Sequence, residues 1–257
     1  MLRNRIIFSL IYSDGNFMQS RNFKLQKVGD IKWLKDFYKF HDISFSLDEL
    51  VVLDSSRNTK NLDTFSEHVK ELSKNVYLPI AAGGGVNNVS DAEFLFHSGA
   101  DKIVLNTLIF ENNEEVNKIT SLYGSQSVVA SIDYKYIDGV PKIYTKNGSI
   151  QTEFDIYDLP KIISSSGVGE VLLNSIDADG TGFGYDIDLV SKLSNIDIPI
   201  IISGGAGNSK HFMQALDLKN ISAVATANLL NFVGDGLPLA RKDLIKKGYN
   251  IADHLVG

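Results

Sequence analysis

Eight short apolar runs, separated from one another mostly by helix-like segments, constrain the fold of this 257-residue chain more than any other feature. Continuous apolar strands that alternate with helices form a parallel sheet that is buried on both faces. Eight strand–helix units in about 250 residues match the size of a closed (β/α)8 TIM barrel. We therefore expect one barrel domain over residues 1–257, with a doubly wound open sheet as the alternative. The runs are residues 5–11, 49–54, 76–82, 102–107, 127–133, 170–175, 198–203 and 222–227.

Two local patterns refine this prediction. Residues 134–152 contain Asp-Gly and Asn-Gly turn signals between short β-like runs, which predicts a β-hairpin insertion after the fifth strand. Ser90 and Glu93 have the Ser-x-x-Glu spacing of a capping box, which predicts a helix with Ser90 as its N-cap.

The chain also repeats itself at half length. Residues 78–88 resemble 198–208, residues 48–56 resemble 169–177, and residues 5–11 resemble 128–133, all at an offset of about 120 residues. Glycines at strand ends serve turns in any barrel, but the common offset favours a duplicated half-barrel.

Composition excludes several classes of protein. A net charge of -6 and a pI near 5.4 argue against a nucleic-acid-binding surface. The chain has no cysteine, which excludes disulfides and thiolate metal sites, and its five histidines are scattered, so we expect neither a metal nor another cofactor. No apolar run approaches the length of a membrane span, and the N-terminal apolar stretch is too short for a secretion signal. We expect a cytoplasmic protein.

The ends of the predicted strands carry the candidate ligand-binding residues, because barrel active sites lie at the carboxyl ends of the strands. Glycine pairs follow strands three and seven, where the backbone can approach an anion. Two such turns in symmetric positions predict two phosphate cradles and a substrate with a phosphate at each end. The first phosphate cradle comprises Gly84, Gly85, Asn106 and Thr107, and the second comprises Gly204, Gly205, Ala227 and Asn228.

Carboxylates close other strands, at Asp54, Asp133 and Asp177. Asp133 ends the fifth strand, where a carboxylate can exchange protons with a substrate, so we expect it to be catalytic. Its counterpart in the repeat is Ile11, which cannot exchange a proton. We place Asp177 with the second phosphate cradle, although an aspartate there can also cap a turn, which is the role we expect for Asp179.

Several of these motifs closely resemble one family, the cyclase subunit of imidazole glycerol phosphate synthase. They include "AAGGGV", "GADKIVLNT", "YGSQSVVASID", "GVGEVLLNSIDADGTGFGYD" and "IIISGGAG", and the resemblance covers nearly the whole chain. It implies that a glutaminase subunit docks on the N-terminal face of the barrel and releases ammonia. The ammonia then crosses the barrel to a bisphosphate ribulosyl substrate at the opposite face.

The chain departs from this family at three positions. The resemblance implies a second catalytic aspartate at residue 11 and a lysine at residue 19, where this chain has Ile11 and Gln19. Asn228 stands where a serine is usual. Loss of a general acid or base typically costs about 10²–10⁴ in rate, so cyclase activity is in doubt.

Charged residues at the opposite ends of the strands match the family. Arg5, Glu49, Lys102 and Glu170 each open a strand, and buried charges persist only when they are paired. The resemblance assigns these four positions to a gate for ammonia, and we assign the neighbouring Asp101 to the docking surface.

Three functional hypotheses follow. The leading one is a cyclase-like subunit that binds a glutaminase and delivers ammonia to a different acceptor, a sugar amidotransferase of surface-glycan biosynthesis; this acceptor rests on resemblance alone. The second is an authentic cyclase in which Asp14, Asp54 or Asp177 replaces the missing acid. The third is a non-catalytic barrel that senses a phosphorylated metabolite.

Overall fold

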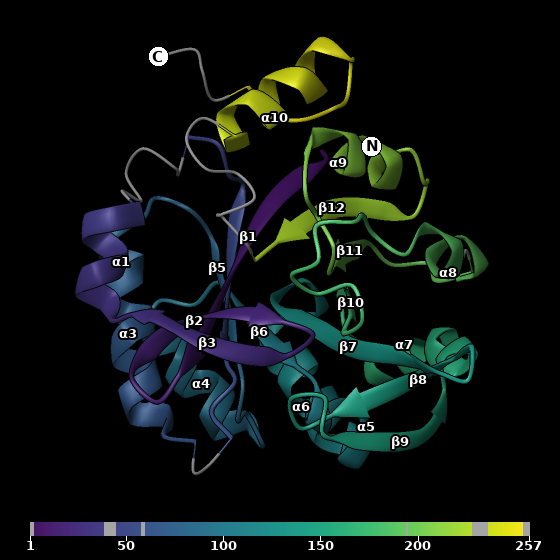
Figure 1. Ribbon diagram of the computed structural model, residues 1–257. Coiled ribbons are helices and arrows are strands. Elements are labelled where there is room, and N and C mark those ends of the chain that lie inside the picture. Colours follow the sequence, from purple (N-terminus) through teal and green to yellow (C-terminus); the bar gives the residue numbers. More distant parts are fainter. Residues whose placement is uncertain (1–2, 39–44, 58–59, 194, 228–235, 254–257) are drawn as a thin grey trace.

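A closed barrel of eight parallel strands forms the centre of the molecule, and Figure 1 shows the helices arranged around it. The computed structural model describes residues 3–38, 45–57, 60–193, 195–227 and 236–253. The strands pair in the order β10-β11-β12-β1-β4-β5-β6-β7, and β7 pairs with β10 to close the barrel. The predicted (β/α)8 barrel is confirmed. Its strands are β1 (Arg5–Ser13), β4 (Glu49–Asp54), β5 (Ile80–Gly83), β6 (Lys102–Leu105), β7 (Val128–Ile137), β10 (Glu170–Ser175), β11 (Ile200–Ser203) and β12 (Ile221–Thr226).

All eight predicted runs overlap these strands, but three strands begin later than predicted: β7 by one residue, and β5 and β11 by four and two residues. β5 and β11 start immediately after Pro79 and Pro199, because a proline has no N–H to donate to the ladder. The carbonyls of both prolines still accept, from Leu50 N at 2.9 Å and from Val171 N at 3.0 Å. Each proline therefore accepts a hydrogen bond from the neighbouring strand one residue before its own strand begins.

Helices occupy the connections between the barrel strands. The described helices are α1 (Ile31–Tyr38), α3 (Leu62–Asn75), α4 (Val89–His97), α5 (Thr107–Glu111), α6 (Asn113–Tyr123), α7 (Leu159–Ser166), α8 (Ile187–Lys192), α9 (Ser209–Leu216) and α10 (Gly236–Lys246). The predicted capping box at Ser90 is wrong, because α4 begins at Val89, two residues earlier than a helix capped by Ser90 would begin. Asn88 is its N-cap, and the Asn88 side chain accepts from Asp91 N at 2.9 Å. No helix among the described residues is long and apolar enough to cross a membrane.

Two β-hairpins project from the barrel. β8 (Val140–Thr145) and β9 (Ile150–Asp155) continue antiparallel from β7 and confirm the predicted insertion. β2 (Asn16–Arg21) and β3 (Lys24–Gly29) form a second hairpin after β1, which the sequence patterns did not predict. The two hairpins meet at Gly148, where an added Cβ would lie 2.8 Å from the ring of Phe23.

Two apolar cores follow from the alternation of side chains along the strands. The larger core lies between the barrel and its helices. The smaller core fills the barrel interior with Ile7, Val51, Ala81, Val104, Val129, Leu172, Ile201, Ala223 and Ala225. Residues two positions before and after these along the same strands therefore face the two open ends of the barrel.

Candidate functional site

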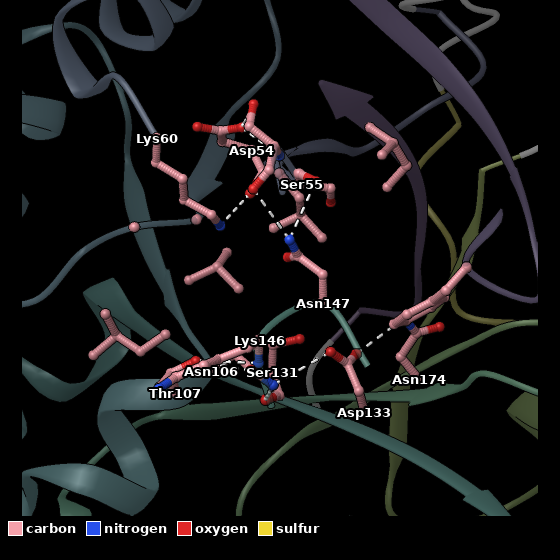
Figure 2. Close-up of a pocket in the computed structure, with 18 of the residues that line it drawn as sticks. Asp54, Ser55, Lys60, Asn106, Thr107, Ser131, Asp133, Lys146, Asn147 and Asn174 are labelled. Carbon is pink, nitrogen blue, oxygen red and sulfur yellow. Dashed lines mark hydrogen bonds between the residues drawn. The ribbon is translucent and has the colours of Figure 1, made fainter. Parts of the chain in front are cut away.

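A cavity of about 750 Å³ opens at the carboxyl ends of the barrel strands (Figure 2). The strand ends, the loops that follow them and both hairpins supply its walls. Its lining includes Asp133, Ile11, Asp54, Lys60, the whole first phosphate cradle, and Ser203 and Ala227. The cavity thus brings together residues that lie far apart in the sequence, at the end of the barrel where the strand-end argument places a site.

Asp133 is the most strongly perturbed carboxylate that lines the cavity. The residue is 8% exposed, and its carboxylate accepts hydrogen bonds from Asn174 Nδ2 at 3.2 Å and from Asn106 Nδ2 at 3.3 Å. Burial raises the pKa of Asp133 to about 7, and the hydrogen bond from Asn174 opposes this shift. A carboxyl group with this pKa can both donate and accept a proton near neutral pH.

Ile11 lines the same cavity as Asp133, so the half-repeat argument correctly places the two positions together. In the sheet, Ile11 lies beside Leu53 of β4 and Met18 of β2. Its aliphatic side chain presents no proton donor or acceptor to the cavity.

The three carboxylates named as substitutes for an aspartate at position 11 have different surroundings. Asp54 lines the cavity, but its Oδ1 accepts from Ser56 N at 2.9 Å and from Ser56 Oγ at 2.6 Å. Asp14 lies in the exposed turn before β2, with a φ of 48°. Asp177 accepts from Tyr136 N at 2.7 Å. Of these three carboxylates, only Asp54 is among the described residues that line the cavity.

The four residues predicted to form the first phosphate cradle all line the cavity. Gly84 and Gly85 have φ values of 106° and 88°, which L-residues rarely adopt. A Cβ on Gly84 would lie 2.2 Å from the carbonyl oxygen of Asp54, so only glycine lets the two backbone segments approach. Asn106 Nδ2 donates to Ser131 O at 2.9 Å, and Thr107 Oγ1 accepts from Lys146 N at 3.4 Å.

The glycine turn of the predicted second phosphate cradle repeats this backbone geometry. Gly204 and Gly205 have φ values of 88° and 106°, and a Cβ on Gly204 would lie 2.5 Å from the carbonyl oxygen of Ser175. Ser175 ends β10, just as Asp54 ends β4, so the half-barrel repeat extends to the turn. Ala227 lines the cavity, and Asn228 lies outside the described residues.

Asp177 and Asp179 link the loop after β10 to the hairpins. The Asp177 carboxylate holds the backbone of β7, and its carbonyl accepts from Asn22 Nδ2 at 2.6 Å. Asp179 Oδ2 accepts from Ser20 Oγ at 2.5 Å and from Phe23 N at 3.1 Å. Asp179 therefore holds the β2–β3 hairpin in place, as a turn-capping aspartate would, and a phosphate-binding role for Asp177 stays a prediction.

A ring of four charged residues, the charged ring, lies at the opposite end of the barrel. Arg5 pairs with both Glu49, at 2.7 Å, and Glu170. Lys102 also pairs with both, at 3.0 Å to Glu49 and 2.9 Å to Glu170. Burial opposes ionisation of Glu170, but its two ion pairs outweigh that effect and lower its pKa. The four side chains thus form a closed cycle of ion pairs around the barrel axis.

Asp101, predicted to belong to the docking surface, is exposed and precedes β6 at the same end as the charged ring. Its Oδ2 accepts from Ile80 N at 2.8 Å and so satisfies the backbone N–H at the start of β5. This contact gives Asp101 a structural role, and its part in docking stays a prediction.

Sequence reasoning missed Asn174, Lys60 and Asn147. Asn174 could have been found, because it lies two positions after Leu172 on the inward face of β10. Lys60 and Asn147 come from loops, where no periodicity indicates which way a side chain points. Asn147 Nδ2 donates to Ser55 O at 3.2 Å, so the turn of the β8–β9 hairpin reaches across to the loop after β4 (Figure 2).

Among the described residues, no group of three or more His, Asp or Glu side chains could hold a metal ion.

Comparisons with known proteins agree with the geometry. A family described as histidine biosynthesis protein matches residues 13–234. A protein of Parasynechococcus marenigrum that is provisionally named imidazole glycerol phosphate synthase subunit hisF2 is 45% identical over 243 residues, which are 94% of this chain and 90% of that protein. The imidazole glycerol phosphate synthase subunits HisF of Flavobacterium psychrophilum and Chlorobium limicola are 37% and 35% identical, over 90% and 96% of this chain and 92% and 98% of their own lengths. The chain therefore belongs to the histidine biosynthesis protein family, as a HisF-like subunit of the imidazole glycerol phosphate synthase type.

Proposed function

We propose that this protein binds a glutaminase subunit at the end of the barrel that carries the charged ring and conducts ammonia to the cavity at the other end. In this proposal the ammonia serves an acceptor other than the ring-forming substrate of imidazole glycerol phosphate synthase. The cavity retains a site for a phosphorylated small molecule. The names of the relatives support membership in a synthase complex. We propose the glutaminase partner and the route of ammonia through the barrel in addition.

One contrast between the two ends of the barrel carries the proposal. The charged ring has all four members, in a closed cycle of ion pairs. The cavity keeps Asp133 but has Ile11 at the symmetry-related position. An acid and a base on two sides of one substrate require two groups that exchange protons, and an isoleucine supplies none. The features that suit ammonia entry are thus complete, whereas those that suit ring closure are not.

The barrel interior is compatible with the passage of neutral ammonia. Apolar side chains fill it between the charged ring and the cavity, and Ile11 adds another at the cavity wall. An ammonium ion would lose most of its hydration there without a compensating partner, at a cost of many kcal/mol. Such an interior favours the uncharged form of the nitrogen.

The proposed acceptor is a sugar bound to a third protein, an amidotransferase of surface-glycan biosynthesis. The loss of the second proton-transfer group and the resemblance to ammonia-supplying subunits support this step. The first test is to mix the purified protein with its candidate glutaminase and to measure glutamate release and imidazole product separately.

We expect stimulated glutamine hydrolysis without imidazole product. Glu170→Gln, which breaks the charged ring, should reduce the stimulation, whereas Lys118→Gln, on the exposed surface of α6, should not. Restored ring product in the double variant Ile11→Asp, Gln19→Lys would show that the rest of the cavity still fits the cyclase substrate. Absence of any effect on a cognate glutaminase would overturn the proposal.

An authentic cyclase is the second candidate, and one observation favours it. Asp133 remains in the cavity with a pKa near 7, and Asp54 lies within the same cavity. Turnover of the ribulosyl substrate with an ammonium salt as the nitrogen source, abolished in Asp133→Asn, would establish this candidate. Binding of a phosphorylated ligand without effect on a glutaminase would instead identify a non-catalytic sensor.

A further inference from the structure

Three basic side chains line the cavity, and two of them are already committed to other contacts. Lys146 Nζ pairs with Glu111 at 3.1 Å, and exposed Arg57 donates to the carbonyl of Phe23 at 2.8 Å. Lys60 makes no ion pair with a carboxylate within the described residues, and its Nζ donates a hydrogen bond to the carbonyl oxygen of Asp54 at 2.6 Å. An ammonium group has three donors, so two remain for a ligand in the cavity.

The first phosphate cradle fixes the position of Lys60. Its aliphatic chain runs along Gly85, where an added Cβ would lie 3.0 Å from Cδ of Lys60. Its head is tied to Asp54, whose backbone also packs against Gly84. The same glycine turn that lets the backbone approach the cavity therefore places a cation beside it.

The surroundings of Lys60 favour the binding of an anion beside its ammonium group. The side chain is half-buried, and burial lowers its pKa, while the charges of Asp54 and Asp133 oppose that effect. A partly desolvated cation without a paired carboxylate is costly unless an anion binds beside it. Figure 2 shows that Lys60 points into the cavity from the wall of Asp54, while Asn106, Thr107 and Asp133 lie on a different wall.

We propose that Lys60 is the cationic ligand for the phosphate group of a phosphorylated sugar bound in the first phosphate cradle. The glycine backbone, the Asn106 amide and the Thr107 hydroxyl supply the neutral contacts, and Lys60 supplies the charge. Neither the glycine turn nor the residues at its edge carry a formal positive charge. The inference deepens the proposed function, because it rests on the cavity's binding a phosphorylated molecule.

The test is calorimetric titration of the full-length protein with ribose 5-phosphate and, in parallel, with ribose. We expect the phosphorylated sugar to bind and ribose not to. Lys60→Met keeps the length of the side chain and removes the charge, so the affinity for ribose 5-phosphate should fall at least about tenfold, the usual effect of losing one charge-assisted hydrogen bond. Lys60→Arg should retain most of the affinity.

Lys146→Met is the matched control, because Lys146 lines the same cavity but is paired with Glu111. Its affinity should change by less than about threefold, as for a side chain in an exposed ion pair. The proposal is overturned if the wild type binds the two sugars equally or neither, if Lys60→Met binds as well as the wild type, or if both methionine variants lose affinity to the same extent. Should Lys60→Met fail to fold, Lys60→Gln gives the same comparison.

The same variants separate this inference from the proposed function. Lys60 lies at the end of the barrel opposite the charged ring, so Lys60→Met should still bind and stimulate a glutaminase. Loss of sugar phosphate binding with intact stimulation supports both proposals. Normal sugar phosphate binding without stimulation of any glutaminase would overturn the proposed function alone.

Discussion

The buried carboxyl group of Asp133 should make the protein less stable as the pH rises, and Asp133→Asn should remove that effect. The folded protein holds the Asp133 proton up to a pKa of about 7, whereas the ordinary value is 3.8. Between these two values the folded state binds one proton more than the unfolded state, so the free energy of unfolding falls with increasing pH. Each pH step of one costs about 1.36 kcal/mol, and the whole interval costs about 4 kcal/mol.

Asparagine at position 133 resembles the protonated aspartic acid, with one acceptor oxygen and one donor group. At low pH, therefore, the variant and the wild type should differ little. Between pH 5 and pH 8 the wild type should lose about 3 kcal/mol that Asp133→Asn does not lose. Every other titrating group is common to both proteins, so the difference between their pH profiles isolates Asp133.

Urea unfolding at several pH values measures this difference directly. A second variant tests the cause: Asn174→Leu removes the donor that favours the charged carboxylate, so it should raise the pKa of Asp133 and extend the loss of stability to higher pH. Parallel pH profiles for the wild type and Asp133→Asn would refute the reasoning, because they would mean that Asp133 titrates alike in the folded and unfolded chains.

Three further predictions concern the scaffold, and urea unfolding measures each of them. Glu49→Gln removes one acid from the charged ring and leaves two partly buried cations short of a partner, so stability should fall by about 3 kcal/mol; no change would mean that the cycle of ion pairs is merely solvated. Gly84→Ala should cost more than about 2 kcal/mol because its Cβ meets a carbonyl oxygen at 2.2 Å, whereas Gly15→Ala, also at positive φ but in open space, should cost about 1 kcal/mol. Arg241→Met should cost about 3–5 kcal/mol because it leaves Asp48 without the guanidinium that contacts it at 2.6 Å, and it should expose the chain near α10 to proteolysis.

The sequence predicted the barrel well because the barrel depends on patterns that a sequence carries directly. Strand identity follows from short apolar runs, and the half-length offset correctly related Gly84 to Gly204 and Asp133 to position 11. Strand starts were less accurate because a proline decides them through one missing N–H, as at Pro79.

The loops were predicted less well than the strands, for a physical reason. The β2–β3 hairpin has few buried residues, and long-range contacts hold it, such as those from Ser20 and Phe23 to Asp179. No local pattern encodes such contacts. The capping error at Ser90 has a different origin: Asn88 and Ser90 can both act as an N-cap, and the backbone before the helix selects Asn88.

The charged ring and the apolar interior together limit what the barrel can pass. Each of the two basic residues of the ring contacts both acids, so opening the ring at any point breaks at least one ion pair. The apolar core inside the barrel, which includes Ile7 and Leu172, lies behind the ring and has no charged side chain to compensate an ion. A neutral molecule has no such requirement once it is past the ring. If the proposed function is correct, the ring therefore controls entry, the interior selects the uncharged form of the nitrogen, and Ile11 extends that selection to the cavity, where an aspartate would instead attract and hold an ammonium ion.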